Sequence, residues 1–304
     1  MSLSIPNQAK VHIALTLVAF IYGLNYTIAK DVMVQEYLTP FAFIFLRIFA
    51  GAVIFTIYHR LFIRERIDRK DVLYTLGCCL FGVVINMLCF FEGLKYTSPI
   101  HASLIMVLTP SLILVISAVV IREKVTAKKV IGLLLGLLGA GLLVTQSSSI
   151  SEKVASVYGD VLVMANAFSY GLYLVLVRKL YKKYHPVTIL RWIFTFGLFL
   201  VFPFGGMDAI TADFSSFPIS IWFSILYVLV MATSVVYLLN AYALSIALPS
   251  MVGFYVYFQP LIATAISILL GNDALNTIKI LSACLLFTGV YFVNSSPRLE
   301  RKTK

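Results

Sequence analysis

The feature that most constrains this chain is an internal repeat. The segment from Pro99 to Val144 has a counterpart 150 positions later, from Pro249 to Asn294, although few residues are identical. What recurs is an order of features: a proline that opens a helix, a second proline within it, an acid at a turn, a lysine and a glycine. The matched pairs are Pro99 and Pro249, Pro110 and Pro260, Glu123 and Asp273, Lys129 and Lys279, and Gly139 and Gly289. A fixed period of this kind predicts two copies of one structural unit.

Composition indicates that the repeat lies in a membrane. Hydrophobic residues make up 61% of the 304 residues and charged residues only 12%, whereas soluble domains carry about 25% charged residues. The mean hydropathy is +0.96. The net charge of +11 would favour nucleic acid in a soluble protein, but the basic residues lie between the apolar segments. We therefore expect a lipid bilayer and no nucleic acid as partner.

Apolar segments of the length that a helix needs to cross a bilayer, about 20 residues, occur ten times along the chain. They cover residues 12–29, 40–58, 72–96, 99–121, 130–146, 159–177, 186–204, 219–244, 249–271 and 278–294. The predicted fold is an all-α integral membrane protein with ten transmembrane helices. The predicted division is 1–146 for the first repeat, 147–157 for a linker, 158–296 for the second repeat and 297–304 for a basic cytoplasmic tail.

The distribution of lysine and arginine predicts the orientation. With the N-terminus inside, inner loops and termini hold 18 of these residues and outer loops hold 4, and positively charged loops stay in the cytoplasm. Both termini should be cytoplasmic, in the plasma (inner) membrane. Because each repeat has an odd number of spans, the second copy must be inverted. Inverted repeats are typical of secondary transporters, and a channel or passive facilitator remains the alternative.

The sequence does not favour an enzyme. No His-Glu-x-x-His motif and no paired transmembrane aspartates occur in the chain. Its four cysteines all lie in apolar segments, where they behave as small hydrophobic residues. We expect no metal, no cofactor and no catalytic residues.

Several short motifs, taken in order, resemble the drug/metabolite transporter superfamily in its ten-helix form with two EamA-type domains. They are Tyr22-Gly23 with Lys30, Gly93 to Pro99, Leu108-Thr109-Pro110, Arg122 to Thr126, Tyr170-Gly171 with Arg178, Ala243-Leu244, Gln259-Pro260 and Gly271 to Asp273. The chain departs from the family pattern at Tyr22 and Tyr170, where tryptophan is more usual, and at Asp273, where glutamate is. The resemblance implies a central cavity surrounded by spans 1–4 and 6–9, with spans 5 and 10 peripheral. It also implies export of amino-acid-like metabolites or drugs, or, as an alternative, exchange of sugars or nucleotide sugars.

Polar and aromatic residues within the spans form the predicted substrate site. In the sixth span Asn166, Tyr170 and Tyr173 follow helical spacing, so that they share one helix face. Such side chains suit a small, partly apolar ligand held by stacking and hydrogen bonds. The full predicted set is Tyr22, Asn25, Asn166, Tyr170, Tyr173, Tyr237, Asn240, Tyr255 and Gln259. The alternative is that these groups only form hydrogen bonds between helices.

Charged residues and prolines within the spans suggest gating. Arg47 and Glu92 are predicted to pair at the outer gate, with Glu92 and His101 as candidates for proton coupling, because ionisable groups in a bilayer are often functional. Pro110 and Pro260 are predicted hinges, since a proline inside a helix bends it; static kinks are the alternative. The expected partners are a small-molecule substrate and lipid, with the protein a monomer.

Overall fold

The structure, a computed structural model, describes residues 7–34, 37–97, 99–145, 156–271 and 274–294. Within these ranges the regular structure is helical and contains no strand. The first half contributes α1 (Asn7–Val34), α2 (Pro40–Tyr58), α3 (Arg69–Cys79), α4 (Asn86–Tyr96), α5 (Pro99–Val107), α6 (Thr109–Val120) and α7 (Ala127–Thr145). The second half contributes α8 (Val157–Tyr181), α9 (Pro186–Thr211), α10 (Ile219–Leu229), α11 (Val236–Ile246), α12 (Pro249–Phe254), α13 (Phe258–Leu269) and α14 (Thr277–Asn294).

Several α-helices are joined or extended by short turns of other helix types. The π-helical turn η2 (Leu80–Ile85) joins α3 to α4, and η4 (Val230–Val235) joins α10 to α11. These two turns lie 150 residues apart, which is the period of the sequence repeat. The remaining turns are η1 (His59–Ile63), η3 (Phe214–Ser216) and η5 (Tyr255–Tyr257). The sequence analysis predicted unbroken helices at η2 and η4, because one extra residue per turn leaves no mark in a uniformly apolar segment.

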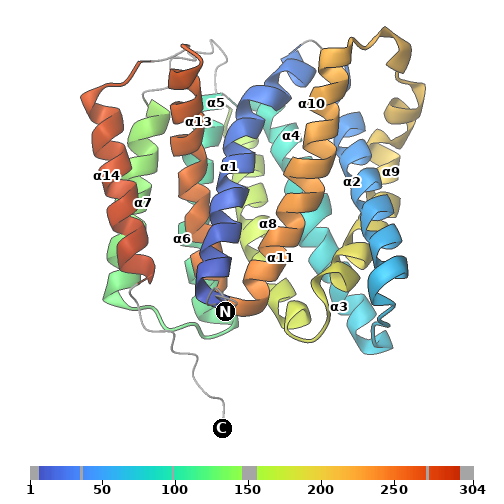
Figure 1. Ribbon diagram of the computed structural model, residues 1–304, viewed down its shortest axis with the longest axis horizontal. Coiled ribbons are helices and arrows are strands. Elements are labelled where there is room, and N and C mark those ends of the chain that lie inside the picture. Colours follow the sequence, from blue (N-terminus) through green and yellow to red (C-terminus); the bar gives the residue numbers. More distant parts are fainter. Residues whose placement is uncertain (1–6, 35–36, 98, 146–155, 272–273, 295–304) are drawn as a thin grey trace, which may run out of the picture.

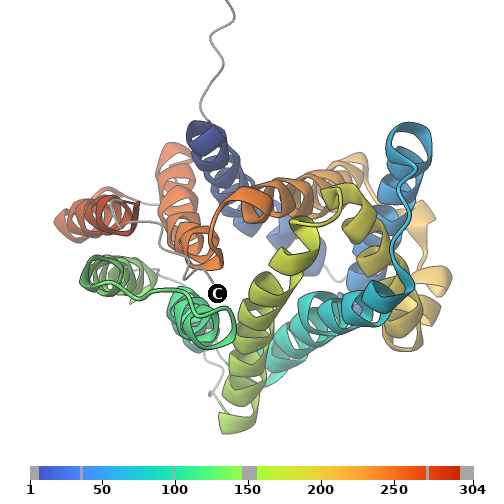
Figure 2. The ribbon, with the colours of Figure 1, turned by 90° about the horizontal axis from the view of Figure 1, so that it is seen from below.

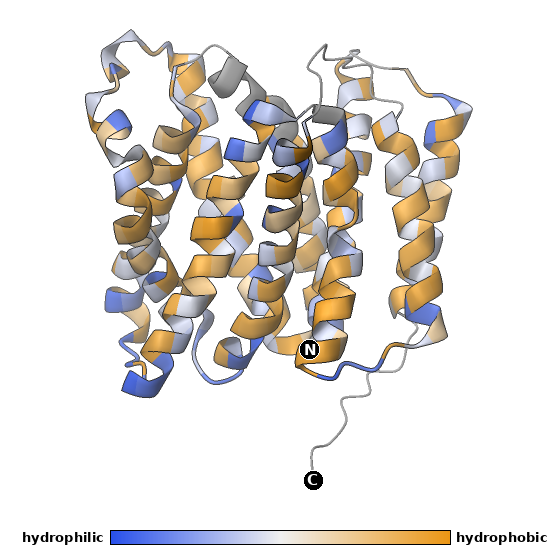
Figure 3. Cartoon of the chain, turned by 180° about the vertical axis from the view of Figure 1, so that it is seen from behind, coloured by the Kyte–Doolittle hydropathy of each residue, from blue (hydrophilic) through white to orange (hydrophobic). Residues whose placement is uncertain are grey.

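Eight helical segments of the described chain are long and apolar enough to cross a membrane, and 277–293 forms a shorter apolar helix. The helix α1 is not among the eight. Large apolar side chains on the outside, such as Phe199 and Leu269, are strongly exposed, as expected for a surface that faces lipid. Figure 3 shows apolar residues along most of the helix middles and hydrophilic residues mainly toward the two ends. The protein is therefore an integral, multi-pass membrane protein.

The helices stand side by side in one bundle (Figure 1). Helix α2 packs along α9 at one edge, and α7 packs along α14 at the opposite edge (Figure 2). Between these edges α8 contacts α4 and α6, while α1 contacts α11 and α13. The chain begins at the lower face in Figure 1, and we call this the N-terminal face. The ends of α8 and α11 and the starts of α7 and α12 lie at the same face.

Glycines allow the close approach of α7 and α14. A Cβ atom added to Gly132 would lie 2.6 Å from the carbonyl oxygen of Gly289, and one added to Gly139 would lie 2.8 Å from that of Ser282. Small residues spaced along one helix let helix backbones approach closely in lipid, and Gly132 and Gly139 do so here. Gly141, on the same helix, has open space around its added Cβ and does not contribute.

Candidate substrate site and contacts at the N-terminal face

The structure gathers five tyrosines inside the bundle, which we call the tyrosine cluster. Its members are Tyr22 of α1, Tyr170, Tyr173 and Tyr181 of α8, and Tyr237 of α11. The rings of Tyr170 and Tyr173 are 6.4 Å apart, and the Tyr173 and Tyr181 hydroxyls are 3.1 Å apart. Tyr22 lies close enough to Tyr170 and Tyr237 to interact with them electrostatically. The sequence analysis named four of these residues; Tyr181, eight positions after Tyr173, was recognisable as a continuation of the same helix face.

The π-helical turn η2 anchors the cluster. In such a turn some carbonyls lose their usual helical partner, and at η2 side chains from the second half supply donors. Tyr237 donates its hydroxyl hydrogen to the Gly82 carbonyl at 3.2 Å, and Ser169 donates to the Phe81 carbonyl at 2.6 Å. A side chain at Gly82 would collide with the ring of Tyr173. Three contacts with the second half, two of them made by cluster tyrosines, therefore depend on one short segment, and π turns are frequent at functional sites.

Two of the three asparagines of the predicted set each keep a buried amide oxygen without a hydrogen-bond donor. Asn166 donates through Nδ2 to the Asn86 carbonyl at 2.6 Å, which ties α8 to α4, but its Oδ1 is unpaired. Asn25, one turn beyond Tyr22 on α1, has an unpaired Oδ1 as well. Buried polar groups in proteins normally find partners, so these acceptors are the places at which a ligand or a moving side chain would be expected.

Tyr255 shares a core cluster with Tyr173, Tyr181 and Tyr237 but contacts the first turns of α1, before Tyr22. Its hydroxyl lies 2.6 Å from Nδ1 of His12, and its ring stacks on Phe258 with centroids 5.5 Å apart. Because an α-helix rises about 1.5 Å per residue, His12 is roughly 15 Å along α1 from Tyr22. The sequence analysis did not select His12. Asn240 and Gln259 are half-buried.

The predicted pairing of Arg47 with Glu92 is wrong for this structure. Arg47 donates through Nε to the Thr233 hydroxyl at 2.9 Å, so it turns toward η4. Glu92 instead pairs with Lys95, one turn away on α4, at 2.6 Å, where both side chains are partly exposed. The prediction used depth in the membrane alone, and depth does not determine which way a helix face points.

His101, the third predicted gate residue, is found with an acid that the sequence analysis did not select. Its Nδ1 lies 3.2 Å from the Asp160 carboxylate, and that carboxylate also accepts a hydrogen bond from the Thr97 hydroxyl. Asp160 belongs to the first turn of α8, at the end of the bundle opposite the N-terminal face. These contacts join the end of α4 to the start of α8.

The predicted hinge prolines lie where helices restart. Pro110 is the second residue of α6 and follows the break after α5, while Pro260 is the third residue of α13 and follows η5. In the first turn of a helix a proline removes no intrahelical donor. Both helix pairs are thus interrupted at equivalent points of the repeat. A role in movement stays a prediction.

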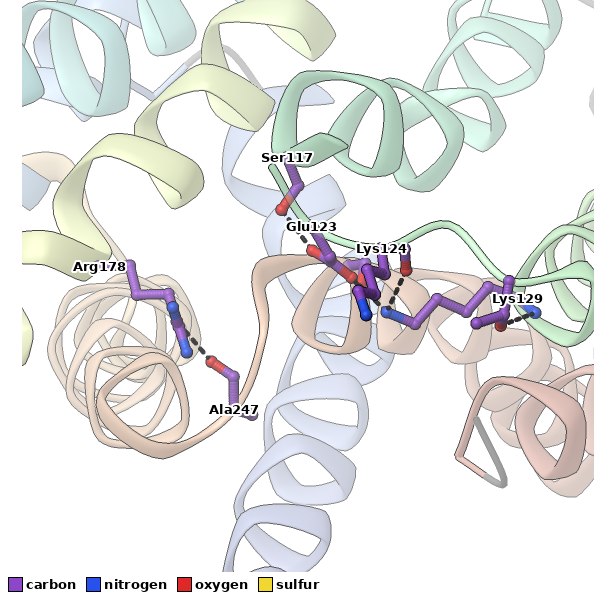
Figure 4. A network of polar contacts seen from close by, with 8 residues as sticks. Ser117, Glu123, Lys124, Lys129, Arg178 and Ala247 are labelled. Atoms are coloured by element: carbon purple, nitrogen blue, oxygen red, sulfur yellow. Dashed lines mark hydrogen bonds and ion pairs between the residues drawn. The ribbon is translucent and has the colours of Figure 1, made fainter. Parts of the chain in front are cut away.

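A buried ionic network lies at the N-terminal face (Figure 4). The Glu123 side chain is fully buried and accepts from Nζ of Lys129 at 2.6 Å. The same carboxylate accepts hydrogen bonds from Ser117 and Ser250. We call these four residues the Glu123 network. Because Ser250 opens α12 and the other three belong to the first half, the network joins the two halves.

A second contact strengthens the same face. Arg178, at the end of α8, is 8% exposed and donates through Nε to the Ala247 carbonyl at 2.9 Å (Figure 4). Ala247 lies between α11 and α12. The sequence analysis treated Glu123, Lys129 and Arg178 only as repeat or family landmarks, since nothing in a local pattern indicates contacts between distant segments.

An apolar hollow of about 620 Å³ lies on the outer side of α1 and α10. It is lined by Ile28, Phe223, Ser224, Leu226, Tyr227, Val230 and Met231. Phe223 and Leu226 are strongly exposed, as for other side chains that face lipid. None of the predicted substrate residues lines this hollow, so it is distinct from the tyrosine cluster.

The helical bundle and its apolar exterior define a multi-pass membrane protein, and both halves match one family of such proteins. Residues 9–145 and 157–295 each match the sequence profile of the EamA-like transporter family. The chain therefore belongs to this family, which confirms the resemblance found in its motifs and identifies a membrane transporter rather than a member of an enzyme family.

Relatives and a solved structure agree with this assignment. The uncharacterized transporter YyaM of Bacillus subtilis is 24% identical over 77% of this chain and 76% of its own length. An uncharacterized transporter of Archaeoglobus fulgidus is 23% identical over 95% and 98%, and the WAT1-related protein At5g47470 of Arabidopsis thaliana is 24% identical over 92% and 84%. One crystal structure of a protein 18% identical in sequence has the same fold, with a TM-score of 0.75 over 98% of this chain and 100% of that one.

Proposed function

We propose that this protein is a secondary transporter that exports a small amino-acid-like metabolite or a drug by alternating access, with the tyrosine cluster in its central cavity. The observation that carries the proposal is the unequal contact of two equivalent helix pairs, α6 with α12 and α5 with α13. At the N-terminal face α6 touches α12, and the Glu123 network bonds them together. At the other face α5 and α13 have no comparable contact among the described residues.

An architecture of ten helices in two inverted repeats is part of the proposal. It counts α1 and α14 as spans beside the eight segments of sufficient length. The helix order supports it, since α3, η2, α4 and α7 are followed 150 residues later by α10, η4, α11 and α14. The packing supports it too: the contact of α1 with α11 has its counterpart in that of α8 with α4. The division into domains at 147–157 follows from the same argument.

The orientation in the membrane follows from the charged loops. The N-terminal face carries the basic loops, so we assign it to the cytoplasm of a plasma or inner membrane. This conformation would then be closed inside and open outside. In an inverted repeat the reverse state is reached when the two halves exchange conformations. The protein would act as a monomer, without cofactor, catalytic activity or nucleic acid.

Pro110 and Pro260 would be the bends about which the two helix pairs move. Replacing both with alanine should slow transport, because continuous helices resist bending. Pro186 provides the matched control, since it opens α9 and bends nothing; Pro186→Ala should transport normally. A folded double variant with an unchanged transport rate would refute the hinge.

The proposed function is tested by finding a ligand and then exchanging it. Thermal unfolding of the purified protein is measured against amino acids, nucleotides, sugars, polyamines and cationic drugs, because a ligand that binds the folded state raises its stability. Compounds that raise the midpoint are then tested for counterflow in proteoliposomes. Exchange of labelled for unlabelled solute supports a carrier, whereas flux without exchange or a measurable conductance would support the channel alternative.

A further inference from the structure

We propose that Arg47 binds an anionic group of the transported molecule, so that the substrates are small organic acids with an apolar or aromatic body. The inference rests on the proposed transport function and adds the substrate class. A cationic guanidinium beside the tyrosine cluster would hold a carboxylate, and the tyrosine rings would cover the rest of the molecule.

The first argument is that the charge of Arg47 is not neutralised by the protein. Its only hydrogen bond among the described residues runs from Nε to Thr233, and it forms no ion pair with a carboxylate in that part of the chain. The Arg47 side chain is only partly buried. An uncompensated charge within a bilayer is costly and typically marks a substrate or ion pathway.

The second argument is that the guanidinium is held in place beside the cluster. Thr233 is fully buried, and its hydroxyl donates to the Val228 carbonyl at 2.8 Å while accepting from Arg47. The hydroxyl therefore has one fixed orientation. Thr233 lies four residues before Tyr237, so the bond to Thr233 holds the guanidinium about one helical turn from the tyrosine cluster. A charge that is fixed before the ligand arrives binds at lower entropic cost.

The third argument concerns which ligands fit. Arginine matches a carboxylate through two parallel hydrogen bonds, and tyrosine combines an apolar ring with a polar hydroxyl. No carboxylate belongs to the cluster, so a cation would meet the positive charge of Arg47 without compensation. The unpaired Oδ1 of Asn25 is an acceptor that tolerates an ammonium group, so that zwitterions remain possible ligands.

The experiment compares ligands that share one body and differ in charge. Thermal unfolding of the full-length protein is titrated with phenylpropionate, phenylalanine, phenylpropionamide and phenethylamine. We expect the acid and the zwitterion to raise the unfolding midpoint, and the neutral amide and the amine to leave it unchanged. Arg47→Gln should weaken binding of the acid about ten- to hundredfold, the usual range for a hydrogen bond to a charged group, and Arg47→Lys should weaken it less.

Arg191 is the matched control, because it too lies in an apolar span but has a protein partner, His59, at 3.1 Å. Arg191→Gln should leave binding of the acid unchanged. The inference is overturned if the amine or amide binds as well as the acid, if Arg47→Gln binds the acid as the wild type does, or if none of the four compounds binds. The comparison of the four ligands uses the wild-type protein. It therefore tests the anion site even if the Arg47→Gln variant does not fold.

Counterflow separates this inference from the proposed function. If only neutral or cationic solutes were exchanged, the proposed transport function would be supported and the anion site at Arg47 would be refuted. Absence of exchange for every solute that binds would reject the transporter itself.

Discussion

Replacing Ser250 with alanine tests whether the Glu123 network keeps the N-terminal face closed. Ser250 donates to the Glu123 carboxylate from the second half of the chain. Ser117 donates to the same carboxylate from the same half as Glu123. Both serines are almost completely buried. The two substitutions thus remove the same chemical bond in the same environment, and they differ only in whether the bond crosses between the halves.

The expected shift of the conformational equilibrium follows from the number of hydrogen bonds that break when the N-terminal face opens. When α12 moves away, Glu123 keeps Ser117 and Lys129 and loses only Ser250. A hydrogen bond to a charged group contributes about 1.5–3 kcal/mol. Ser250→Ala should therefore shift the equilibrium between closed and open states toward open by about ten- to hundredfold. Ser117→Ala should lower the stability of the fold by a similar amount and leave that equilibrium unchanged, because its bond is present in both states.

The open state is measured by the reactivity of a cysteine behind the network. Val252, on α12, is 3% exposed, and Val252→Cys in a protein with Cys89 and Cys284 replaced should react slowly with a membrane-impermeant maleimide in inside-out vesicles. The rate should rise about ten- to hundredfold with Ser250→Ala and stay constant with Ser117→Ala. Equal rates in the two serine variants would refute the reasoning and leave the network a structural feature only.

Two further predictions concern stability. Gly132→Ala should destabilise the fold by about 1–3 kcal/mol through overpacking against α14, and Gly141→Ala, which has space, should not; equal thermal midpoints for the two variants would contradict this. In the loops, the Lys183 hydrogen bond lowers the pKa of Asp68, and the Asp68 hydrogen bond raises the pKa of Lys183. The Asp68 contribution is present above its ordinary pKa of 3.8 and is lost as pH falls through the lowered folded value. The Lys183 contribution is present below 10.5 and is lost as pH rises through the raised folded value. Asp68→Asn should therefore lessen the acid-side fall of the unfolding midpoint, and an unaltered pH profile would count against the pair.

Local periodicity predicted most of the helices, without the breaks at η2 and η4, and four of the five cluster tyrosines. Two tyrosines of α8 could be found because they repeat at helical spacing. Arg47 and Glu92 were paired wrongly because the position of a residue within its span predicts its depth in the membrane but not the direction in which its side chain points. The Glu123 network was missed for a related reason: Ser250 and Glu123 are 127 residues apart, and each looks ordinary in its own surroundings.

The residues that differ between the repeats matter most for the proposed cycle. If two inverted halves were identical, the states closed inside and closed outside would have equal energy, and neither would be preferred. The repeat period pairs Ser250 with Ile100 and Glu123 with Asp273. Isoleucine has no hydroxyl to donate, so the serine–carboxylate bond that joins the two halves has no sequence counterpart in the other copy, whereas the bond within one half does, because Ser117 is matched by Ser267. The preference for the state seen in the structure is therefore assigned to this mismatch. Ser250→Ala, which makes the two copies more alike at this position, should bring the two states closer in energy.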